Sequence, residues 1–568
     1  MKRFIYQIGR LEAEMKPRKF RINFSEPIES NLSSIALKKY FCQNYKDDRI
    51  YTILAFPVSL PFNNRLEKSN SLSDDFKKKI KGLNEKNEEK ENYFKDPESF
   101  FNFHPHSREV DYFFVIHSIG TFNNVDFNAD FNFIVFDIFL DILYRFLYEV
   151  IKVDGKNEYK SEDIHLYIDV SSGHNIYVSA LIEATNIFEE FYNYLNLFQG
   201  KTLNVNLVFS DPVFDESSIY DIHTEYSLKH KLFFKNQFDE KDIKDNVAAK
   251  IISFEKNCYR EFNKKEIDNF NDEISADNLI KNLINKDKRE LKNIISNILN
   301  YYSIVYSSLK NATPLPLYQF EQNFFYKKKE YIINEQLIMG TINDIIKIAG
   351  FLLRKNWNFV NISTDNFTDN NMEISYFDYL KKVLFSFAFL SSYLKEARKL
   401  DIRFKDMVSY DEILNNFVEN EKSILNKMGN ITGMKLVGNE LFTYKQKNKE
   451  GTSVEENVNS NWVTLSRCLP FYDKTKDNEF NINPRHFLAH SGFERNITEI
   501  KKEDNQLYFR YKVENSSVFE NLSEKMSEKI SENLPENIFE NISDNINNVN
   551  KPKNRIKNII ADILLKNL

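Results

Sequence analysis

The chain has 568 residues, of which 42% are apolar and 28% are charged, and its formal net charge is −6. This is an ordinary globular composition and excludes a wholly disordered chain. The length is several times that of one average domain, so two or three folded units are expected. The slight negative charge gives no overall basic surface, so any binding of nucleic acid or nucleotides has to be local.

The three cysteines, Cys42, Cys258 and Cys468, form no Cys-x-x-Cys pair. A disulfide framework and a cysteine zinc site are therefore not expected, and a reducing cytoplasm is the expected location. Residues 1–16 place charges on both sides of a short apolar run, which is unlike a signal peptide. The longest apolar helical stretch, residues 383–394, falls short of the ~20 residues that span a bilayer, so no membrane association is expected.

The first part of the chain alternates short apolar runs with segments of helical periodicity. Buried strands are predicted at residues 3–8, 50–56, 112–117, 164–170 and 203–209. Long apolar-faced helices are predicted at residues 131–150 and 175–198. This alternation is typical of a Rossmann-like α/β domain with a parallel sheet and helices on both faces. The Lys- and Glu-rich segment 69–95 is expected to be a solvated loop or an exposed helix.

From about residue 240 the pattern becomes mainly helical. The amphipathic segment 244–308 precedes two stronger helix predictions at residues 330–355 and 375–400. A repetitive Ser/Glu/Asn/Ile segment follows at residues 520–550, and a last helix is expected at residues 555–568. The predicted organisation is a ligand-binding domain at 1–235, a helical intermediate region at 236–355 and a C-terminal helical domain at 356–568.

One segment with chemical potential is the strand-to-helix turn that follows Asp169. It consists of Ser171, Ser172, Gly173, His174 and Asn175. Ligands of parallel α/β sheets bind beyond the carboxyl ends of the strands, where free backbone N–H groups at helix N-termini favour phosphate. The plain alternative is a turn in which a serine caps the helix.

Two more strand ends are expected at the same edge of the sheet. Gly9 and Arg10 follow the first strand, and Ser210 follows the fifth. Arg10 is suited to meet a phosphate, although an exposed arginine is often just a solvated charge. Phe56 ends the second strand and is assigned to packing rather than to recognition.

The second segment lies near the C-terminus. Asn483 and Pro484 are favourable cap and first-turn residues, so a helix should begin there. His486 and His490, four positions apart, share one helix face. Arg485 can hold a phosphodiester, and a histidine can move protons to or from a ribose hydroxyl. These groups suffice for RNA cleavage with the 2′-hydroxyl as nucleophile.

Other interpretations of this segment exist. His486 and His490 could be half of a zinc site, but a zincin needs Glu after the first His, and Phe487 is there instead. No third ligand of obvious spacing follows, so no metal is expected. A helix start with incidental polar residues also fits. The clustering of the two histidines, after none between His230 and His486, favours a functional site.

Taken together, the two segments resemble the CRISPR-associated CARF–HEPN ribonucleases, ancillary effectors of type III systems. The CARF segment of that family reads Asp, hydrophobic, Thr, His, Gly, any residue, Asn. Residues 169–175 keep the Asp, a hydroxyl, the Gly and the Asn, with Ser172 at the position of the His. The HEPN motif is Arg, a polar residue, three variable residues and His, which matches Arg485 to His490 with His486 in the polar position. Residues 244–444 contribute only helical character.

This resemblance implies a signal-dependent endoribonuclease of type III CRISPR antiviral defence. Its activator would be a cyclic oligoadenylate, with cyclic tetra-adenylate expected, bound across a two-fold dimer interface by residues 171–175, Gly9, Arg10 and Ser210. Arg485, His486 and His490 of both subunits of a homodimer, or of a higher even oligomer, would form the catalytic site. Cleavage of single-stranded RNA would require no metal or other cofactor and would leave a cyclic phosphate.

Two alternatives belong to other functional classes. A non-enzymatic CARF sensor would bind the nucleotide and act through a protein or DNA partner. The absence of a basic helix-turn-helix pattern and the presence of Arg485 and His490 argue against it. A HEPN toxin-type ribonuclease without nucleotide control is disfavoured by the α/β domain with its phosphate-ready loop.

Overall fold

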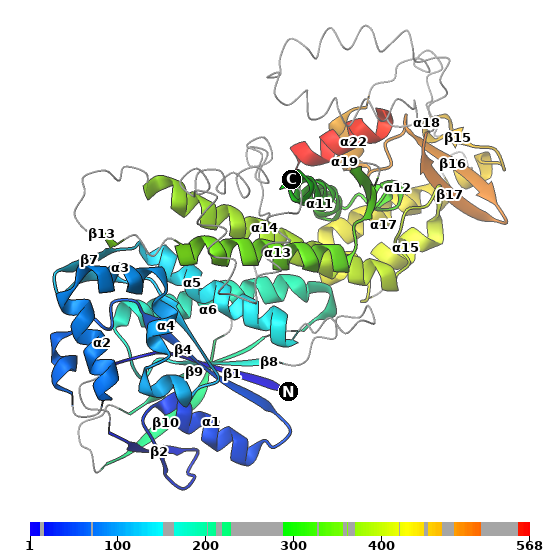
Figure 1. The fold of residues 1–568 in the computed structure, drawn as a ribbon. Helices are drawn as coiled ribbons and strands as arrows, with labels where there is room; N and C mark the ends of the chain where they lie inside the picture. Colours follow the sequence, from blue (N-terminus) through cyan, green and yellow to red (C-terminus); the bar gives the residue numbers. More distant parts are fainter. Residues whose placement is uncertain are drawn as a thin grey trace.

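The computed structural model describes residues 1–11, 16–69, 72–150, 164–201, 203–211, 218–228, 288–326, 329–355, 360–361, 370–419, 421–447, 453–468, 482–512 and 555–567. In these ranges an N-terminal α/β half and a C-terminal half are connected by two long helices that run side by side (Figure 1). The predicted segment 244–308 is described only from residue 288, and the repetitive segment 520–550 lies outside the described residues.

The centre of the N-terminal half is an eight-stranded sheet. Its strands, from edge to edge, are β3 (Ile28–Ser30), β2 (Arg18–Ile22), β10 (Ile219–Leu228), β9 (Asn204–Ser210), β8 (Ile164–Asp169), β1 (Lys2–Ile8), β4 (Arg49–Pro57) and β5 (Tyr112–Ile116). The five strands from β9 to β5 are mutually parallel, and they are the five predicted from the sequence. The sequence interpretation missed β2, β3 and β10, where polar residues interrupt the apolar pattern.

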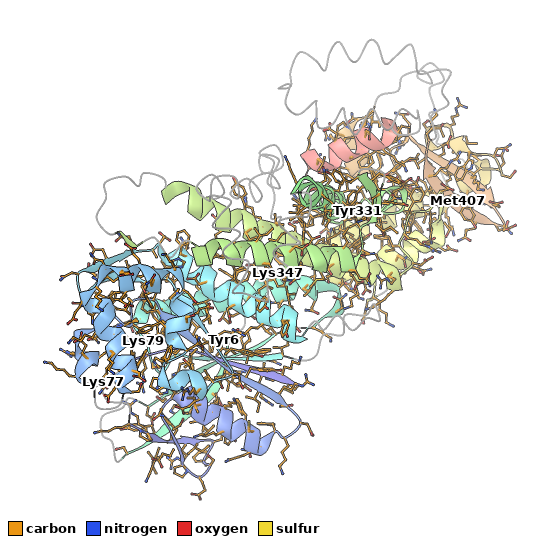
Figure 2. All side chains as sticks on the ribbon, in the orientation of Figure 1. Tyr6, Lys77, Lys79, Tyr331, Lys347 and Met407 are labelled. Carbon is orange, nitrogen blue, oxygen red and sulfur yellow. The ribbon has the colours of Figure 1, made fainter. Side chains whose placement is uncertain are left out.

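Helices cover both faces of this sheet, as predicted. One face carries α5 (Phe131–Arg145), which continues through a π-helical turn (Phe146–Val150), and α6 (Asn175–Leu195), which is followed by the 3-10 turn η4 (Leu197–Gln199). The other face carries α1 (Ser33–Asn44). Strand β1 alternates between the faces: Tyr6 packs on the α5 side and donates a hydrogen bond to Asp141 of α5, and Ile5 packs on the α1 side (Figure 2).

The residues of segment 69–95 that the structure describes are mainly helical, and they are not simply an exposed insertion. They contain α2 (Asp74–Glu85) and α3 (Asn87–Lys95), which precede α4 (Pro97–Phe101). A separate hydrophobic core includes the buried Phe76 and Ile80 of α2 and Phe94 of α3, together with Leu54 and Phe56 of β4. The exposed Lys79 shows the opposite, solvated face of α2 (Figure 2). The abundance of charges concealed an amphipathic period whose apolar side belongs to the core.

Short elements complete this half. They are the 3-10 turns η1 (Asn64–Lys68) and η2 (Pro105–Arg108) and the hairpin of β6 (Ile119–Phe122) and β7 (Val125–Asn128). Strand β13 (Val360–Asn361), from the connection between the two long helices, pairs antiparallel with β7. Main-chain pairing therefore links the C-terminal half of the chain to the N-terminal domain.

The C-terminal half is mainly helical, as predicted. Its first elements are α11 (Lys288–Lys310), α12 (Leu315–Gln319), the hairpin of β11 (Asn323–Tyr326) and β12 (Lys329–Ile332), and the two long helices α13 (Glu335–Lys355) and α14 (Asn370–Lys399). Then follow α15 (Tyr410–Phe417), α16 (Ile424–Lys427), α17 (Ile431–Lys445), the 3-10 turn Glu455–Asn457, α18 (Leu465–Cys468), α19 (Pro484–Ala489) and α22 (Arg555–Lys566). Helix α22 confirms the predicted last helix.

A small antiparallel sheet in this half was not predicted. Its strand order is β14 (Val408–Ser409), β17 (Gln506–Tyr511), β16 (Thr498–Glu503) and β15 (Val463–Thr464). Ile500, Leu507 and Phe509 alternate toward the core, and the β16–β17 turn places Asp504 and Asn505 at positive φ. Alternation around an Asp-Asn turn is a hairpin signal that the emphasis on helices overlooked.

Helix α14 joins the two halves. It packs against α5, α6 and η4 on the N-terminal side and against α11 and α13 on the other (Figure 1). The Phe385 ring contacts the rings of Phe191 and Tyr194, and the Ser392 hydroxyl accepts a hydrogen bond from the N–H of Phe198 at 3.2 Å. The predicted apolar stretch 383–394 is thus a buried core helix. No helix in the described ranges is long and apolar enough to cross a membrane.

The turn between β8 and α6 depends on Gly173. Its φ is +115°, and an added Cβ atom would lie 2.9 Å from Cβ of Ile8. We expect Gly173→Ala to lower the free energy of unfolding by about 2–5 kcal/mol, since backbone strain and overpacking add. Gly200→Ala is the matched control, because Gly200 has φ +65° with no atom near an added Cβ. Its expected cost is about 1–2 kcal/mol. If urea denaturation shows the same loss of unfolding free energy in Gly173→Ala and Gly200→Ala, the close contact of Gly173 with Ile8 does not add to the cost.

Buried His104 anchors the loop after β1. Its Nε2–H donates to the Arg10 carbonyl at 3.0 Å, its Nδ1 accepts from the N–H of His106, and burial lowers the pKa of His104 to about 3. Because the folded state favours the neutral ring, the contribution of His104 to the free energy of unfolding is fully present above pH 6.5. This contribution is lost as the pH falls toward 3. The expected slope is about 1.4 kcal/mol per pH unit. Denaturation curves between pH 7 and 4 should show a shallower dependence for His104→Asn, and equal slopes would refute the prediction.

Candidate functional site

The first candidate site lies where the parallel strands of the large sheet end. Asp169, the last residue of β8, is completely buried. Its carboxylate accepts hydrogen bonds from the Ser33 hydroxyl at 2.7 Å and from the N–H of Ser171 at 2.9 Å. Burial raises the pKa of Asp169, and these hydrogen bonds partly oppose that effect. Asp169 therefore holds the loop and the start of α1 together, away from solvent.

Gln7 of β1 extends this polar network. Its side-chain amide donates to the Ser33 hydroxyl at 3.0 Å and to the Ser172 hydroxyl at 2.9 Å, and its carbonyl oxygen accepts from the Ser34 hydroxyl. Sequence reasoning missed Gln7, Ser33 and Ser34. The available signal was the position of Gln7 near the end of β1, which parallel pairing brings beside Asp169.

The loop then exposes its tip to solvent. Gly173, His174 and Asn175 are exposed, whereas Ser171 and Ser172 are half-buried. His174 is the N-cap of α6, and its side chain makes no capping hydrogen bond. The first N–H groups of this 21-residue helix have no side-chain cap, and such groups, together with the helix dipole, favour an anion.

The other predicted ligand residues lie at the same edge with different roles. The Ser210 N–H donates to the Ser171 hydroxyl at 2.8 Å, so these two strand ends meet. The Arg10 guanidinium donates to the Asn31 carbonyl at 3.2 Å and remains half-exposed. Gly9 is buried: its N–H donates to the Ala55 carbonyl, and an added Cβ would lie 2.3 Å from the Phe56 ring. Gly9 thus makes room for Phe56, which is fully buried as predicted.

The second candidate site is built on α19. The side chain of Asn483 accepts hydrogen bonds from the N–H groups of Arg485 and His486, which confirms the predicted cap. Buried Phe487 fixes the inner side of this short helix. The helix ends at Ala489, because Ser491 and Gly492 adopt positive φ and the N–H of Gly492 returns to the Phe487 carbonyl.

The three predicted catalytic residues lie on α19 or at its C-terminal end, and the structure shows a contact between two of them, His486 and His490. Arg485 and His486 are exposed, and no hydrogen bond or ion pair holds the Arg485 guanidinium within the described part of the chain. The rings of His486 and His490 are neighbours, with centroids 6.3 Å apart and planes at 74°. The His490 side chain is about one quarter exposed, at 25%.

A carboxylate that the sequence did not reveal contacts His490. Nδ1 of His490 lies 3.1 Å from Oε2 of Glu440 in α17, and Oε1 of Glu440 accepts a hydrogen bond from the Tyr444 hydroxyl at 2.6 Å. A second carboxylate, the buried Glu494, is close enough for His490 to lower its pKa, although burial raises that pKa overall. Glu440 precedes His490 by 50 positions, and no motif marks it.

Chemically, the site offers a guanidinium, two imidazoles and a carboxylate beside one of them. Arginine neutralises phosphate charge and imidazole transfers protons, the two tasks of phosphodiester cleavage. No group of three or more His, Cys, Asp or Glu residues that could hold a metal ion occurs among the described residues.

Comparisons with known proteins match both halves of the chain. Residues 4–212 match the family model described as "CRISPR system endoribonuclease Csx1, CARF domain". Residues 411–513 match the model described as "CRISPR system endoribonuclease Csx1, HEPN domain". None of the curated proteins compared with the chain matches it. The first interval contains the strand-end site, and the second contains Glu440 and α19. The chain therefore belongs to the CARF–HEPN family of CRISPR-associated ribonucleases.

Proposed function

We propose that this nucleotide-sensing ribonuclease is switched on by a cyclic oligoadenylate, with cyclic tetra-adenylate as the expected ring, and then cleaves single-stranded RNA without a metal ion. The observation that supports the proposal is the presence in one chain of an exposed strand-end loop without a side-chain helix cap and of a short helix that carries Arg485 and leads into His490, which contacts Glu440. It would act in type III CRISPR antiviral defence.

The ligand part of the proposal rests on the exposed loop tip. Gly173, His174 and Asn175 offer backbone N–H groups, an imidazole and an amide to solvent at the N-terminus of α6. Half-exposed Arg10 adds a positive charge at the same edge, near enough to oppose part of the rise that burial causes in the pKa of Asp169. Two such edges related by a two-fold axis in a homodimer would surround a ring of phosphates.

In the proposed reaction, His490 removes the proton from a ribose 2′-hydroxyl. The 2′-oxygen forms a bond to the adjacent phosphorus while the bond from phosphorus to the 5′-oxygen breaks. The leaving oxygen takes a proton from water, and His490 then returns the proton that it removed to the solvent. Arg485 would neutralise the phosphate, and His486 would supply a second imidazole. The products are a 2′,3′-cyclic phosphate and a 5′-hydroxyl. The corresponding residues of a second subunit would complete the site.

Replacement of His490 tests the catalytic assignment. We expect His490→Ala to reduce the rate of RNA cleavage by about 10²–10⁴-fold, the usual contribution of general acid–base catalysis. The assay uses full-length protein with EDTA, with and without cyclic tetra-adenylate. His165→Ala, at the opposite end of β8, is the matched control and should cleave normally. Unchanged activity in His490→Ala would refute the assignment, and loss of wild-type activity in EDTA would indicate a metal mechanism.

Replacement of Asn175 tests the sensor assignment. We expect Asn175→Ala to weaken binding of cyclic tetra-adenylate by about 10-fold or more, since a hydrogen bond to a charged ligand contributes about 1.5–3 kcal/mol. Calorimetry measures binding, and RNA cleavage against activator concentration measures the response. Asn44→Ala, at the exposed end of α1, should change neither. Normal binding and response in Asn175→Ala would remove this loop from the proposed site. Binding by a wild-type protein that never cleaves RNA would favour the non-enzymatic sensor.

A further inference from the structure

His490 has only one ring nitrogen that can face RNA, because Nδ1 is occupied. Nδ1 lies 3.1 Å from Oε2 of Glu440. A carboxylate only accepts hydrogen bonds, so Nδ1 must carry the proton that it shares with Glu440. In the neutral ring, Nε2 then holds the lone pair. The contact thus determines which tautomer of His490 is present and which nitrogen can accept a proton.

Both carboxylate oxygens of Glu440 have a partner: Oε2 contacts His490 and Oε1 contacts Tyr444. Its Oε1 accepts the Tyr444 hydroxyl at 2.6 Å, and burial raises the pKa of Tyr444 well above its usual value, so the phenol keeps the proton that it donates. The Tyr444 ring packs against Phe493 and Phe509 in the core. Tyr444 and Glu440 are four residues apart on one face of α17, so the packing of that helix sets the position of the carboxylate.

We propose that Glu440 is a positioning residue of the ribonuclease site: it fixes the His490 tautomer, aims Nε2 at the RNA and stabilises the imidazolium that forms when the ring takes a proton. Tyr444 orients Glu440. The proposal rests on the function proposed above, in which His490 transfers the proton. Glu440 itself touches neither phosphate nor ribose in this scheme.

An ordinary surface ion pair is the competing explanation. Such pairs contribute little to stability, and their removal changes no single catalytic parameter selectively. The protein contains a pair that serves as a standard. The side chains of Glu499 and Arg510 are 14% and 25% exposed, the same values as those of Glu440 and His490, and they lie on β16 and β17 of the same half. Glu499→Gln is therefore a matched control for Glu440→Gln.

The expected result is a selective loss of turnover. In full-length protein with cyclic tetra-adenylate, Glu440→Gln should lower kcat by about 10²-fold or more, as the loss of a carboxylate that orients a histidine does in other enzymes. The KM for RNA should change less than about twofold, because Glu440 does not contact the RNA and its loss leaves substrate binding unchanged. Tyr444→Phe should lower kcat less, and Glu499→Gln should leave it unchanged.

The pH profile distinguishes positioning from a structural role. Removal of a negative charge beside an imidazole favours its neutral form. The acidic limb of the kcat profile should therefore move to lower pH in Glu440→Gln and stay in place in Glu499→Gln. Glu440→Asp, which keeps the charge, should restore the position of that limb, and thermal melting checks that each variant is folded.

Comparison with His490→Ala separates the two proposals. If His490→Ala shows the expected reduced rate, the double variant Glu440→Gln/His490→Ala should be no slower than His490→Ala alone, because the carboxylate acts through the imidazole. Wild-type kcat and pH profile in a folded Glu440→Gln protein would overturn the role of Glu440 while the role of His490 stands. Full activity in His490→Ala would instead overturn the proposed function itself.

Discussion

The packing of α14 against α6 is the contact on which both halves of the molecule depend. Phe385, Phe389 and Tyr393 are essentially fully buried, and the large hydrophobic core that contains them includes residues of both halves. Helix α6 begins at the strand-end loop and leads into η4, which is hydrogen-bonded to Ser392 of α14. One helix thus connects the strand-end loop to the contact with α14, and packed interiors of this kind deform little. A ligand shifts such an arrangement only through different affinities for its two states.

Both candidate sites combine a carboxylate that makes several hydrogen bonds, buried in the case of Asp169 and partly buried in the case of Glu440, with exposed residues of a helix. Asp169 accepts a hydrogen bond from the N–H of Ser171 in the strand-end loop, and Glu440 contacts Nδ1 of His490. Asn175 and Arg485 are exposed at these two sites. The net charge of −6 gives no overall basic surface, so the cations at the two candidate sites are local: Arg10 beside the strand-end loop and Arg485 on α19.

Strong local patterns were predictable, and long-range partners were not. The five parallel strands and helices α5, α6 and α19 follow from apolar periodicity and from caps such as Asn483, which act over a few residues. Strands β2, β3 and β10, at one side of the large sheet, escaped because polar residues dilute their pattern, whereas the β16–β17 hairpin was overlooked despite its alternation and its Asp-Asn turn. Gly9 and Gly173 both lie at strand ends, yet only the structure separates the glycine that admits Phe56 from the one that shapes the loop.

The sequence by itself determined the fold class, the family and the positions of the loop at residues 171–175 and of Arg485 and His490, because short motifs and helix caps are local features. Only the tertiary structure decided which side chains complete the sites. Gln7 and Ser33 reach the loop through parallel strand pairing, and Glu440 reaches His490 through the packing of α17. Such contacts join residues 50 to 165 positions apart, and no short-range pattern in one sequence specifies them.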